Sequence, residues 1–184
     1  AQKGISIDHL PPSFFIGGNT KQVWENILRD DYDNWDVPTL QEEYNAYKQD
    51  NPLPYKELIF PDVLKVLNEV KSRGLKIGLA SSSVKADILR ALEENRLDCF
   101  FDVVLSGEEF KESKPNPEIY LTALKHLNVE ANQALIIEDS EKGIAAGVAA
   151  GVEVWAIKDN RFGMDQGAAK GLLDNLVDVL GLLK

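Results

Sequence analysis

From about residue 62 onward, the apolar positions follow two alternating patterns. Short uninterrupted apolar runs are separated by longer segments in which apolar residues recur every three or four positions. The first pattern is typical of strands buried on both faces, and the second is typical of amphipathic helices. The strands that this predicts are Leu75–Ala80, Asp102–Leu105, Ala134–Ile137 and Val152–Ile157.

A helix is predicted before the first strand, between each pair of successive strands and after the last strand. These helices are Asp62–Arg73, Val84–Glu94, Pro117–Leu127, Glu141–Ala150 and Ala168–Leu183. Strands joined by single helices form parallel sheets that are covered on both faces. The expected fold class is therefore α/β, with a Rossmann-like parallel sheet and helices on both faces.

The first part of the chain has no strand candidate of comparable strength. Two amphipathic helices are predicted there, at Thr20–Arg29 and Thr39–Lys48. Thr39 and Glu42 have the spacing of a capping box, and the aromatic residues are interpreted as core. The proline-containing segment 51–54 predicts a stiff linker. We expect a small α-helical cap over residues 1–58 and an α/β core over residues 59–184.

The amino-acid composition disfavours some classes of binding partner. The chain has 184 residues, of which 30 are acidic and 20 are basic, giving a net charge of −10. This charge disfavours nonspecific binding to nucleic acid or to an anionic membrane, and it requires local cations for any anionic substrate. Cys99 is the only cysteine, so no internal disulfide is possible and a reducing compartment is favoured. With no signal peptide and no membrane-spanning apolar run, a cytoplasmic protein is expected.

Three hydroxyl groups, those of Ser81, Ser82 and Ser83, follow the first predicted strand. Ligands of open parallel sheets bind at the carboxyl ends of the strands, where the following helices begin. Hydroxyl and backbone N–H groups at that place can bind a phosphoryl oxygen. The alternative is that one serine only caps the helix that begins at Val84.

Lys114 lies in a proline-rich loop, Ser113-Lys114-Pro115-Asn116-Pro117. The prolines restrict the backbone and therefore the directions in which the lysine can point. A fixed ammonium beside a phosphoryl group would stabilise the charge on its oxygens. The alternative is an exposed lysine before a helix that starts at Pro117. Asn116 and Ser83 are candidates to face a substrate.

Glu138 and Asp139 follow a strongly apolar predicted strand, Ala134–Ile137. Two adjacent acids at a buried strand end are costly without a cation or good hydrogen-bond donors. Mg²⁺ prefers carboxylate oxygens and water, and it often uses only one or two carboxylates. The alternative is that Asp139 or Ser140 caps the following helix.

Two other motifs are weaker. Gly17-Gly18-Asn19-Thr20 has no preceding strand and no P-loop lysine, so it is interpreted as a turn before a helix. Gly17, Gly18 and Asn19 are nevertheless candidates to face a substrate. Asp31-Tyr32-Asp33 matches Asp-x-Asp, but it follows a helical stretch and is interpreted as a solvated turn.

The ordered set of motifs resembles the haloacid dehalogenase superfamily. The segments Leu79–Ser83, Ser113–Tyr120 and Ile136–Gly147 are similar to its second, third and fourth motifs. The closest resemblance is to the β-phosphoglucomutase-like phosphatase branch, which carries a helical cap. It extends from about Ile5 to the C-terminus. No single motif is specific, but their order and separation are.

This resemblance implies Mg²⁺-dependent phosphoryl transfer. Ser81, with Ser82 beside it, would bond the transferring phosphoryl group, and Lys114 would neutralise that group and orient the nucleophile. Asp139, together with Glu138, would hold Mg²⁺ directly or through water. The cap would close over the site and select the substrate.

The first motif of the family is absent. In the family, an Asp on the central strand becomes an aspartyl phosphate, and a second Asp two residues later is the general acid and base. No Asp-x-Asp follows an apolar run here. We expect that strand to lie upstream, between the strands that end at Ser81 and Glu138 in the sheet. We also expect the cap to be incomplete at its N-terminus, and the chain by itself to be inactive.

The leading hypothesis is a monomeric phosphatase that acts on a small phosphorylated metabolite. A sugar phosphomutase that acts on a sugar phosphate needs the same core and differs in the cap. A non-catalytic binding module on the same scaffold is the alternative from another class. A Rossmann-type nucleotide binder is disfavoured because no Gly-x-Gly-x-x-Gly follows a strand.

Overall fold

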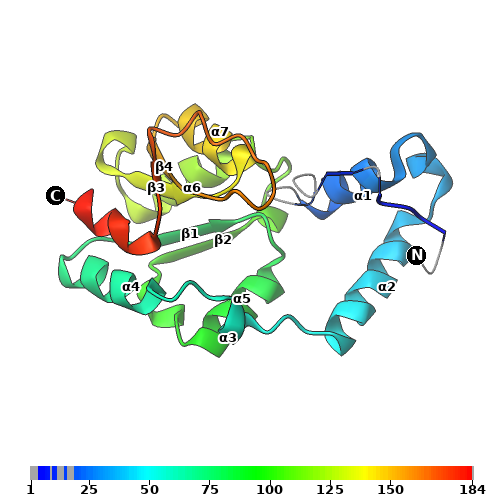
Figure 1. Ribbon diagram of the computed structural model, residues 1–184, viewed down its shortest axis with the longest axis horizontal. Coiled ribbons are helices and arrows are strands. Elements are labelled where there is room, and N and C mark those ends of the chain that lie inside the picture. The colour runs from blue at the N-terminus through cyan, green and yellow to red at the C-terminus, as the bar shows by residue number, and fades with distance from the viewer. Residues whose placement is uncertain (1–3, 9, 12–14, 16–18, 184) are drawn as a thin grey trace.

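The computed structural model describes residues 4–8, 10, 11, 15 and 19–183. It consists of an α/β body and a helical unit to one side, joined by an extended connection (Figure 1). The α-helices are α1 (Thr20–Leu28), α2 (Val37–Asp50), α3 (Tyr55–Leu58), α4 (Val63–Ser72), α5 (Lys85–Asn95), α6 (Glu118–Leu127) and α7 (Glu141–Ala149). The 3₁₀ helices are η2 (Arg29–Asn34), η3 (Asp98–Phe100), η4 (Gly107–Glu109), η5 (Ala131–Gln133) and η6 (Leu176–Gly181).

The strands form two parallel sheets. In the first sheet, β1 (Gly78–Ser81) pairs with β2 (Val103–Ser106). In the second, the order is β3 (Leu135–Glu138), β4 (Glu153–Ile157) and β5 (Gly171–Leu173). The four predicted strands are confirmed, but within the part of the chain that is described no ladder joins β1 to β3. The predicted strand between them stays a prediction.

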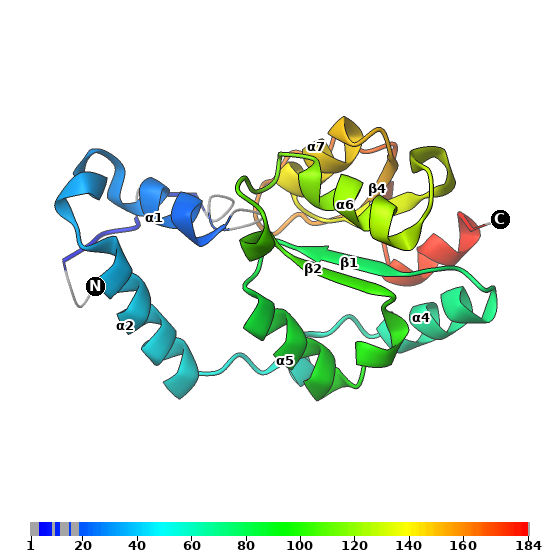
Figure 2. The ribbon, with the colours of Figure 1, turned by 180° about the vertical axis from the view of Figure 1, so that it is seen from behind.

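Helices cover both faces of the first sheet, as the apolar runs predict. Leu79 and Val104 pack against the cluster of Ile88 in α5, whereas Leu105 packs with Ile119 in α6. Figures 1 and 2 show α4 and α5 on one side of β1 and β2, with α6 and α7 on the other. The predicted α/β class, Rossmann-like with parallel strands, is confirmed.

The predicted helix over Ala168–Leu183 is wrong. The chain forms β5, which pairs in parallel with β4, and then η6. At Gly171 a Cβ would lie 2.4 Å from the Trp155 ring, so only a glycine allows this close strand pairing. Asn175 and Asp178 then form the capping box that starts η6. Apolar spacing alone does not separate a short strand plus a 3₁₀ turn from one long helix.

The two helices predicted for the helical unit are present, but the capping box predicted at the N-terminus of the second helix is not. α2 begins at Val37 rather than Thr39, and Asp36 is its N-cap. The Asp36 carboxylate accepts hydrogen bonds from the Thr39 N–H at 3.1 Å and from the Thr39 hydroxyl at 2.8 Å. The capping box of Thr39 with Glu42 is therefore wrong.

Among the described residues, an ion pair between Lys48 of α2 and Asp87 of α5 joins the helical unit to the α/β body. After the extended segment 51–54, α3 packs on α5, and the Arg90 guanidinium lies 4.6 Å from the Tyr55 ring centroid. The domain boundary near residue 58 stays a prediction. Of the helices in the described ranges, none combines the length and the apolar character needed to cross a bilayer.

Candidate active site

A cavity of about 1090 Å³ lies where α1 and α2 face the carboxyl ends of β1 and β3. Its wall on the α/β body contains the strand-end and loop residues that carry the predicted chemistry, namely Ser81, Ser82, Ser83, Lys114, Glu138, Asp139 and Ser140. The structure thus brings residues from three separate sequence segments to one wall, because parallel strands end at the same rim.

The serines follow β1 in a tight turn. The Ser83 N–H donates to Ser81 Oγ at 3.1 Å, and the Ser106 hydroxyl donates to the Ser83 carbonyl at 2.8 Å. The N-cap of α5 is Val84, which makes no side-chain capping bond. The capping alternative for the serines is therefore wrong, and the turn leaves Ser81 and Ser82 in the cavity wall.

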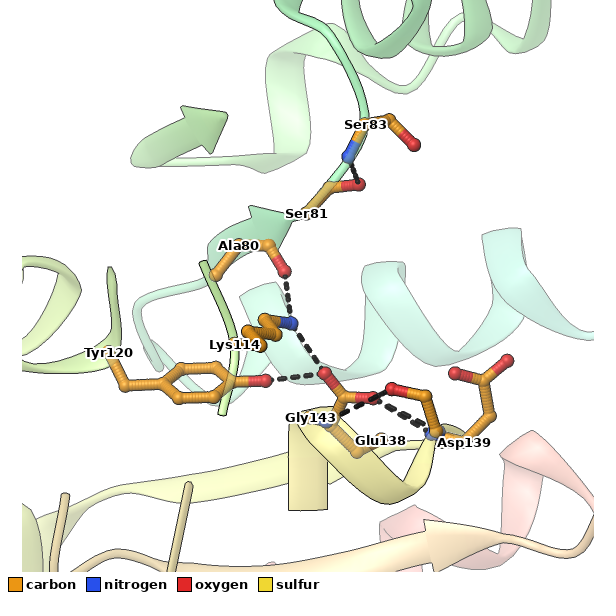
Figure 3. A network of polar contacts seen from close by, with 9 residues as sticks. Ala80, Ser81, Ser83, Lys114, Tyr120, Glu138, Asp139 and Gly143 are labelled. Atoms are coloured by element: carbon orange, nitrogen blue, oxygen red, sulfur yellow. Dashed lines mark hydrogen bonds and ion pairs between the residues drawn. The ribbon is translucent and has the colours of Figure 1, made fainter. Parts of the chain in front are cut away.

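Lys114 is buried, with 5% of its side chain exposed. Its ammonium donates to the Ala80 carbonyl at 3.0 Å and to Glu138 Oε1 at 2.5 Å (Figure 3), and it lies 4.8 Å from the centroid of the Tyr120 ring. The alternative of an exposed lysine is wrong. An ammonium has three N–H donors, and the described residues take two of them, so the third can serve a ligand in the cavity.

Glu138 is surrounded by donors. Oε1 accepts from Lys114 and from the Tyr120 hydroxyl at 2.5 Å, and Oε2 accepts from the Ser140 hydroxyl at 3.0 Å. Oε2 also accepts from the N–H groups of Asp139 and Ser140, at 3.1 and 3.2 Å. Burial alone would raise the pKa of Glu138, but the Lys114 charge and these hydrogen bonds hold that pKa below its ordinary value. Both carboxylate oxygens of Glu138 therefore already accept hydrogen bonds within the protein.

Two residues of this arrangement were not singled out by the sequence reasoning as part of the site, Tyr120 and Gly143. Burial, and next the Glu138 charge, raise the pKa of Tyr120, which keeps its hydroxyl protonated as a donor. At Gly143, a Cβ would lie 2.0 Å from the carboxyl carbon of Glu138. Ser140 caps α7 by accepting from the Gly143 N–H at 3.1 Å, which confirms the capping alternative for Ser140. The spacing Glu-Asp-Ser-x-x-Gly was the available signal.

The carboxylate of Asp139 differs from that of Glu138 in exposure and in hydrogen bonding. It is exposed in the cavity wall, and Figure 3 shows its carboxylate directed away from the Glu138 network. Within the described residues, no other residue donates a hydrogen bond to that carboxylate, whereas its main chain is bonded on both sides. Partial desolvation by the wall, and next the charge of Glu138, raise the pKa of Asp139. A nearby cation would relieve both effects.

The opposite wall of the cavity is apolar and aromatic. It is formed by residues of α1 and α2, among them Val23, Trp24, Ile27, Leu40, Tyr44 and Tyr47. The Trp24 and Tyr44 rings meet edge to face with centroids 6.4 Å apart, and Trp24 Nε1 donates to Gln41 at 2.7 Å. Tyr44 and Tyr47 are 49% and 62% exposed, so the interpretation of these two tyrosines as core is wrong.

Two predicted substrate-facing residues, Asn116 and Asn19, do not line this cavity. Asn116 lies just before α6, whose N-cap is Pro117, and its side chain accepts from the Glu118 N–H at 2.9 Å. Asn19 is the N-cap of α1, lies on a neighbouring pocket and accepts from the Gln22 N–H at 2.9 Å. Gly17 and Gly18 lie outside the described residues.

Few described side chains near Asp139 could act as ligands of Mg²⁺. Over the described ranges, no three His, Cys, Asp or Glu side chains converge as metal ligands. Glu138 already uses both oxygens, whereas the carboxylate of Asp139 is accessible and accepts no hydrogen bond from another described residue. Since Mg²⁺ usually keeps several waters and takes one or two carboxylates, the Asp139 carboxylate could hold this ion.

The family model described as haloacid dehalogenase-like hydrolase matches residues 6–157. The crystal structure of β-phosphoglucomutase from Clostridium difficile superimposes with a TM-score of 0.79 at 26% identity, covering 95% of this chain and 78% of that one.

Two of the relatives in sequence are named as phosphatases. A phosphorylated carbohydrates phosphatase of Thermotoga maritima is 35% identical over 129 residues, 67% of this chain and 59% of the relative. A phosphoglycolate phosphatase of Aquifex aeolicus is 30% identical over 139 residues, 76% of this chain and 63% of the relative. The chain thus spans less than two thirds of the length of either relative. With a family match over most of its length and these relatives, the chain belongs to the haloacid dehalogenase-like hydrolase family.

Proposed function

We propose that the protein is a Mg²⁺-dependent phosphoryl-transfer enzyme, a phosphatase that acts on a small phosphorylated metabolite. The observation that carries this proposal is the single cavity that Ser81, Lys114 and Asp139 line together. A hydroxyl, an ammonium and an accessible carboxylate on one wall supply what a bound phosphate dianion and its counter-cation need.

Ser81 and Lys114 can each offer a hydrogen-bond donor to a ligand in the cavity. Ser81 Oγ accepts from the Ser83 N–H, so the hydroxyl proton of Ser81 remains available for a phosphoryl oxygen. Lys114 keeps one N–H donor after its bonds to Ala80 and Glu138. We propose that these two donors stabilise the charge that spreads over the equatorial oxygens during transfer.

Asp139 would hold Mg²⁺, with Glu138 acting through its hydrogen bond to the Asp139 N–H rather than as a direct ligand. The ion would supply positive charge beside the phosphoryl group. Additional positive charge is needed because the two lysines in the cavity wall, Lys48 and Lys114, already form ion pairs with carboxylates. A phosphate dianion entering here without a counter-cation would be repelled by Asp139.

The attacking group that we propose is the aspartate that the family resemblance implies. An aspartate oxygen would form a bond to phosphorus while the bond from phosphorus to the alcohol oxygen breaks, and a second aspartate would give that oxygen its proton. Water would then release phosphate from the aspartyl phosphate. In the described part of the chain no Asp-x-Asp follows a strand, and Asp31-Tyr32-Asp33 lies in η2. We therefore expect the 184-residue chain alone to be inactive.

The helical unit over residues 1–58 is proposed as the cap that selects the substrate. Its aromatic wall faces the polar wall across the cavity, so a substrate with a phosphate at one end and a ring at the other would fit both. The C–H face of a sugar ring packs well on tyrosine and tryptophan rings. The Thermotoga maritima relative, by its name, acts on phosphorylated carbohydrates, which supports a sugar phosphate as substrate.

A sugar phosphomutase is the second candidate, favoured by the structural similarity to β-phosphoglucomutase. A mutase returns the phosphoryl group to the sugar, whereas a phosphatase passes it to water. Inorganic phosphate and isomerised sugar phosphate, measured in one reaction mixture, separate these two outcomes.

The test is phosphate release from a panel of phosphomonoesters with and without Mg²⁺. We expect none from the 184-residue chain and Mg²⁺-dependent release from a longer form that also carries an Asp-x-Asp strand. In that form Asp139→Asn should abolish activity, whereas Asp33→Asn on the exposed surface of η2 should leave it intact. An inactive longer form would favour the non-catalytic binding module, and full activity of Asp139→Asn would rule out the proposed metal site.

A further inference from the structure

A buried glutamine connects the loop after β4 to the main chain of Asp139. Gln166 is 9% exposed and lies between β4 and β5. Its Nε2 donates to the Asp139 carbonyl and to the Ile157 carbonyl, both at 2.8 Å. Its Oε1 accepts from the Asp159 N–H at 3.2 Å. Both amide N–H groups and the amide oxygen are therefore used within the protein.

These partners occupy a particular place in the sheet. The last register pair of β3 with β4 is Glu138 with Ala156, so Asp139 and Ile157 are the first residues beyond the paired region. Parallel strands lose their mutual hydrogen bonds at such an end, and the free carbonyls need other donors. Gln166 supplies both donors from one side chain.

Asp139 is consequently held on both sides. Its N–H donates to Glu138 Oε2 at 3.1 Å, and its carbonyl accepts from Gln166 at 2.8 Å. Fixing the two peptide groups that flank a residue fixes its φ and ψ, which sets the direction of its side chain. Figure 3 shows the Asp139 carboxylate directed away from Glu138. No other described residue donates a hydrogen bond to the side chain, so the direction of its Cα–Cβ bond depends on the main chain.

The loop that carries Gln166 is anchored in turn. The Ala169 N–H donates to the Gln166 carbonyl at 3.1 Å, and the Asp165 N–H lies 3.5 Å from Glu141 Oε2 at the first turn of α7. These contacts hold Gln166 against the end of β3 rather than leaving it on a free loop.

We infer that Gln166 is a positioning residue, which holds the main chain of Asp139 so that its carboxylate points into the cavity. Only the use of that carboxylate as a metal ligand rests on the proposed function. The restraint on the Asp139 main chain does not, and the two parts are tested separately.

The first test uses amide hydrogen exchange on the chain, with peptides or resonances that cover residues 138–143. Gln166→Met keeps the size of the side chain and removes the amide. We expect exchange at the Asp139 and Ser140 amides to become at least about tenfold faster in this variant. Gln166→Asn, whose amide is too short to reach both carbonyls, should give a smaller increase and serves if Gln166→Met does not fold.

The matched control is Val66→Ala, a buried substitution in α4 far from the site. It destabilises the chain without touching the Asp139 turn, so it reports general loosening. If the Gln166 variants accelerate exchange at Asp139 and Ser140 no more than Val66→Ala does at equal loss of unfolding free energy, the inference is overturned.

The second test measures Mn²⁺ binding by the loss of free-ion EPR signal, with Mn²⁺ as the probe for the Mg²⁺ site. Asp139→Asn should abolish binding, Gln166→Met should weaken it at least about fivefold, and Val66→Ala should leave it unchanged. Binding that is absent from the parent chain or unaffected by Asp139→Asn would refute the proposed metal site, and the exchange result would still decide the role of Gln166. Binding that is lost in Asp139→Asn but unchanged in Gln166→Met would overturn the inference.

Discussion

Lys114 and Glu138 form a buried ion pair that connects the two sheets. The pair is 2.5 Å apart, and the side chains are 5% and 9% exposed. The same ammonium donates to the carbonyl of Ala80 in β1, whereas Glu138 is the last residue of β3. Because no ladder joins β1 to β3 over the described ranges, this lysine provides a polar link between them at the rim where the cavity lies.

Replacing Lys114 by Met should destabilise the chain by about 3–5 kcal/mol at neutral pH, since it leaves the Glu138 carboxylate buried without its counter-charge. The double variant Lys114→Met with Glu138→Gln should recover a large part of this loss, because both charges are then removed together. Urea unfolding of the single and double variants measures both effects.

The control is the exposed pair of Lys158 and Asp174, with 3.6 Å between Lys158 Nζ and Asp174 Oδ1 and with side chains 47% and 78% exposed. Lys158→Met should cost less than about 1 kcal/mol, because water already solvates both charges. Equal costs at Lys114 and Lys158 would show that Lys114 is not buried in solution as the structure describes.

Gly143→Ala should destabilise the chain, although alanine normally favours a helix over glycine by about 0.5–1 kcal/mol. The new Cβ would lie 2.0 Å from the carboxyl carbon of Glu138, so either the carboxylate or the first turn of α7 must move. We expect a loss of about 1–3 kcal/mol, typical of overpacking, in urea unfolding. Gly181→Ala, where nothing lies within 4 Å of the added Cβ, should be close to neutral. A Gly143→Ala variant as stable as the parent would contradict the packing of Glu138 against α7.

The apolar runs were sufficient to locate the four longer strands and the helices between them, because buried parallel strands are apolar on both faces. They failed at β5. The segment from Gly171 to Leu173 is too short to show a period, and its strand conformation depends on the packing of Gly171 against Trp155, which is distant in sequence. Tertiary contacts of this kind override local spacing.

The site was predictable to the level of motifs. Ser81, Lys114 and Asp139 line one cavity because strand ends and the loops near them converge, which is a property of the topology. The sequence could not show that Glu138 and Asp139 differ. The Glu138 carboxylate accepts hydrogen bonds from Lys114 and Tyr120, whereas the Asp139 carboxylate accepts none from another described residue. Neither Tyr120 nor Gln166 lies in a pattern that marks a buried hydrogen bond to a distant residue.

Acid should weaken the fold partly through Asp102, which precedes β2. Its Oδ2 accepts from the Ile77 N–H at 2.8 Å and lies 2.9 Å from Lys71 Nζ. The hydrogen bond from Ile77, and next the bond from Lys71, hold the pKa of Asp102 below its ordinary value. In the unfolded chain the pKa of an Asp is about 3.9, so near and below that pH the unfolded chain binds more protons than the folded chain. The free energy of unfolding therefore decreases as the pH is lowered.

The contribution of Asp102 should therefore be present above about pH 4 and lost as the pH falls through its lower folded-state pKa. Between about pH 5 and pH 2.5, Asp102→Asn should show a shallower fall in the free energy of unfolding than the parent, whereas Asp33→Asn on the exposed surface of η2 should follow the parent. At about 1 M salt the share that comes from Lys71 should shrink, because this pair is partly exposed, while the share from the Ile77 bond should persist. Parallel pH profiles for Asp102→Asn and the parent would show that neither bond is retained in solution.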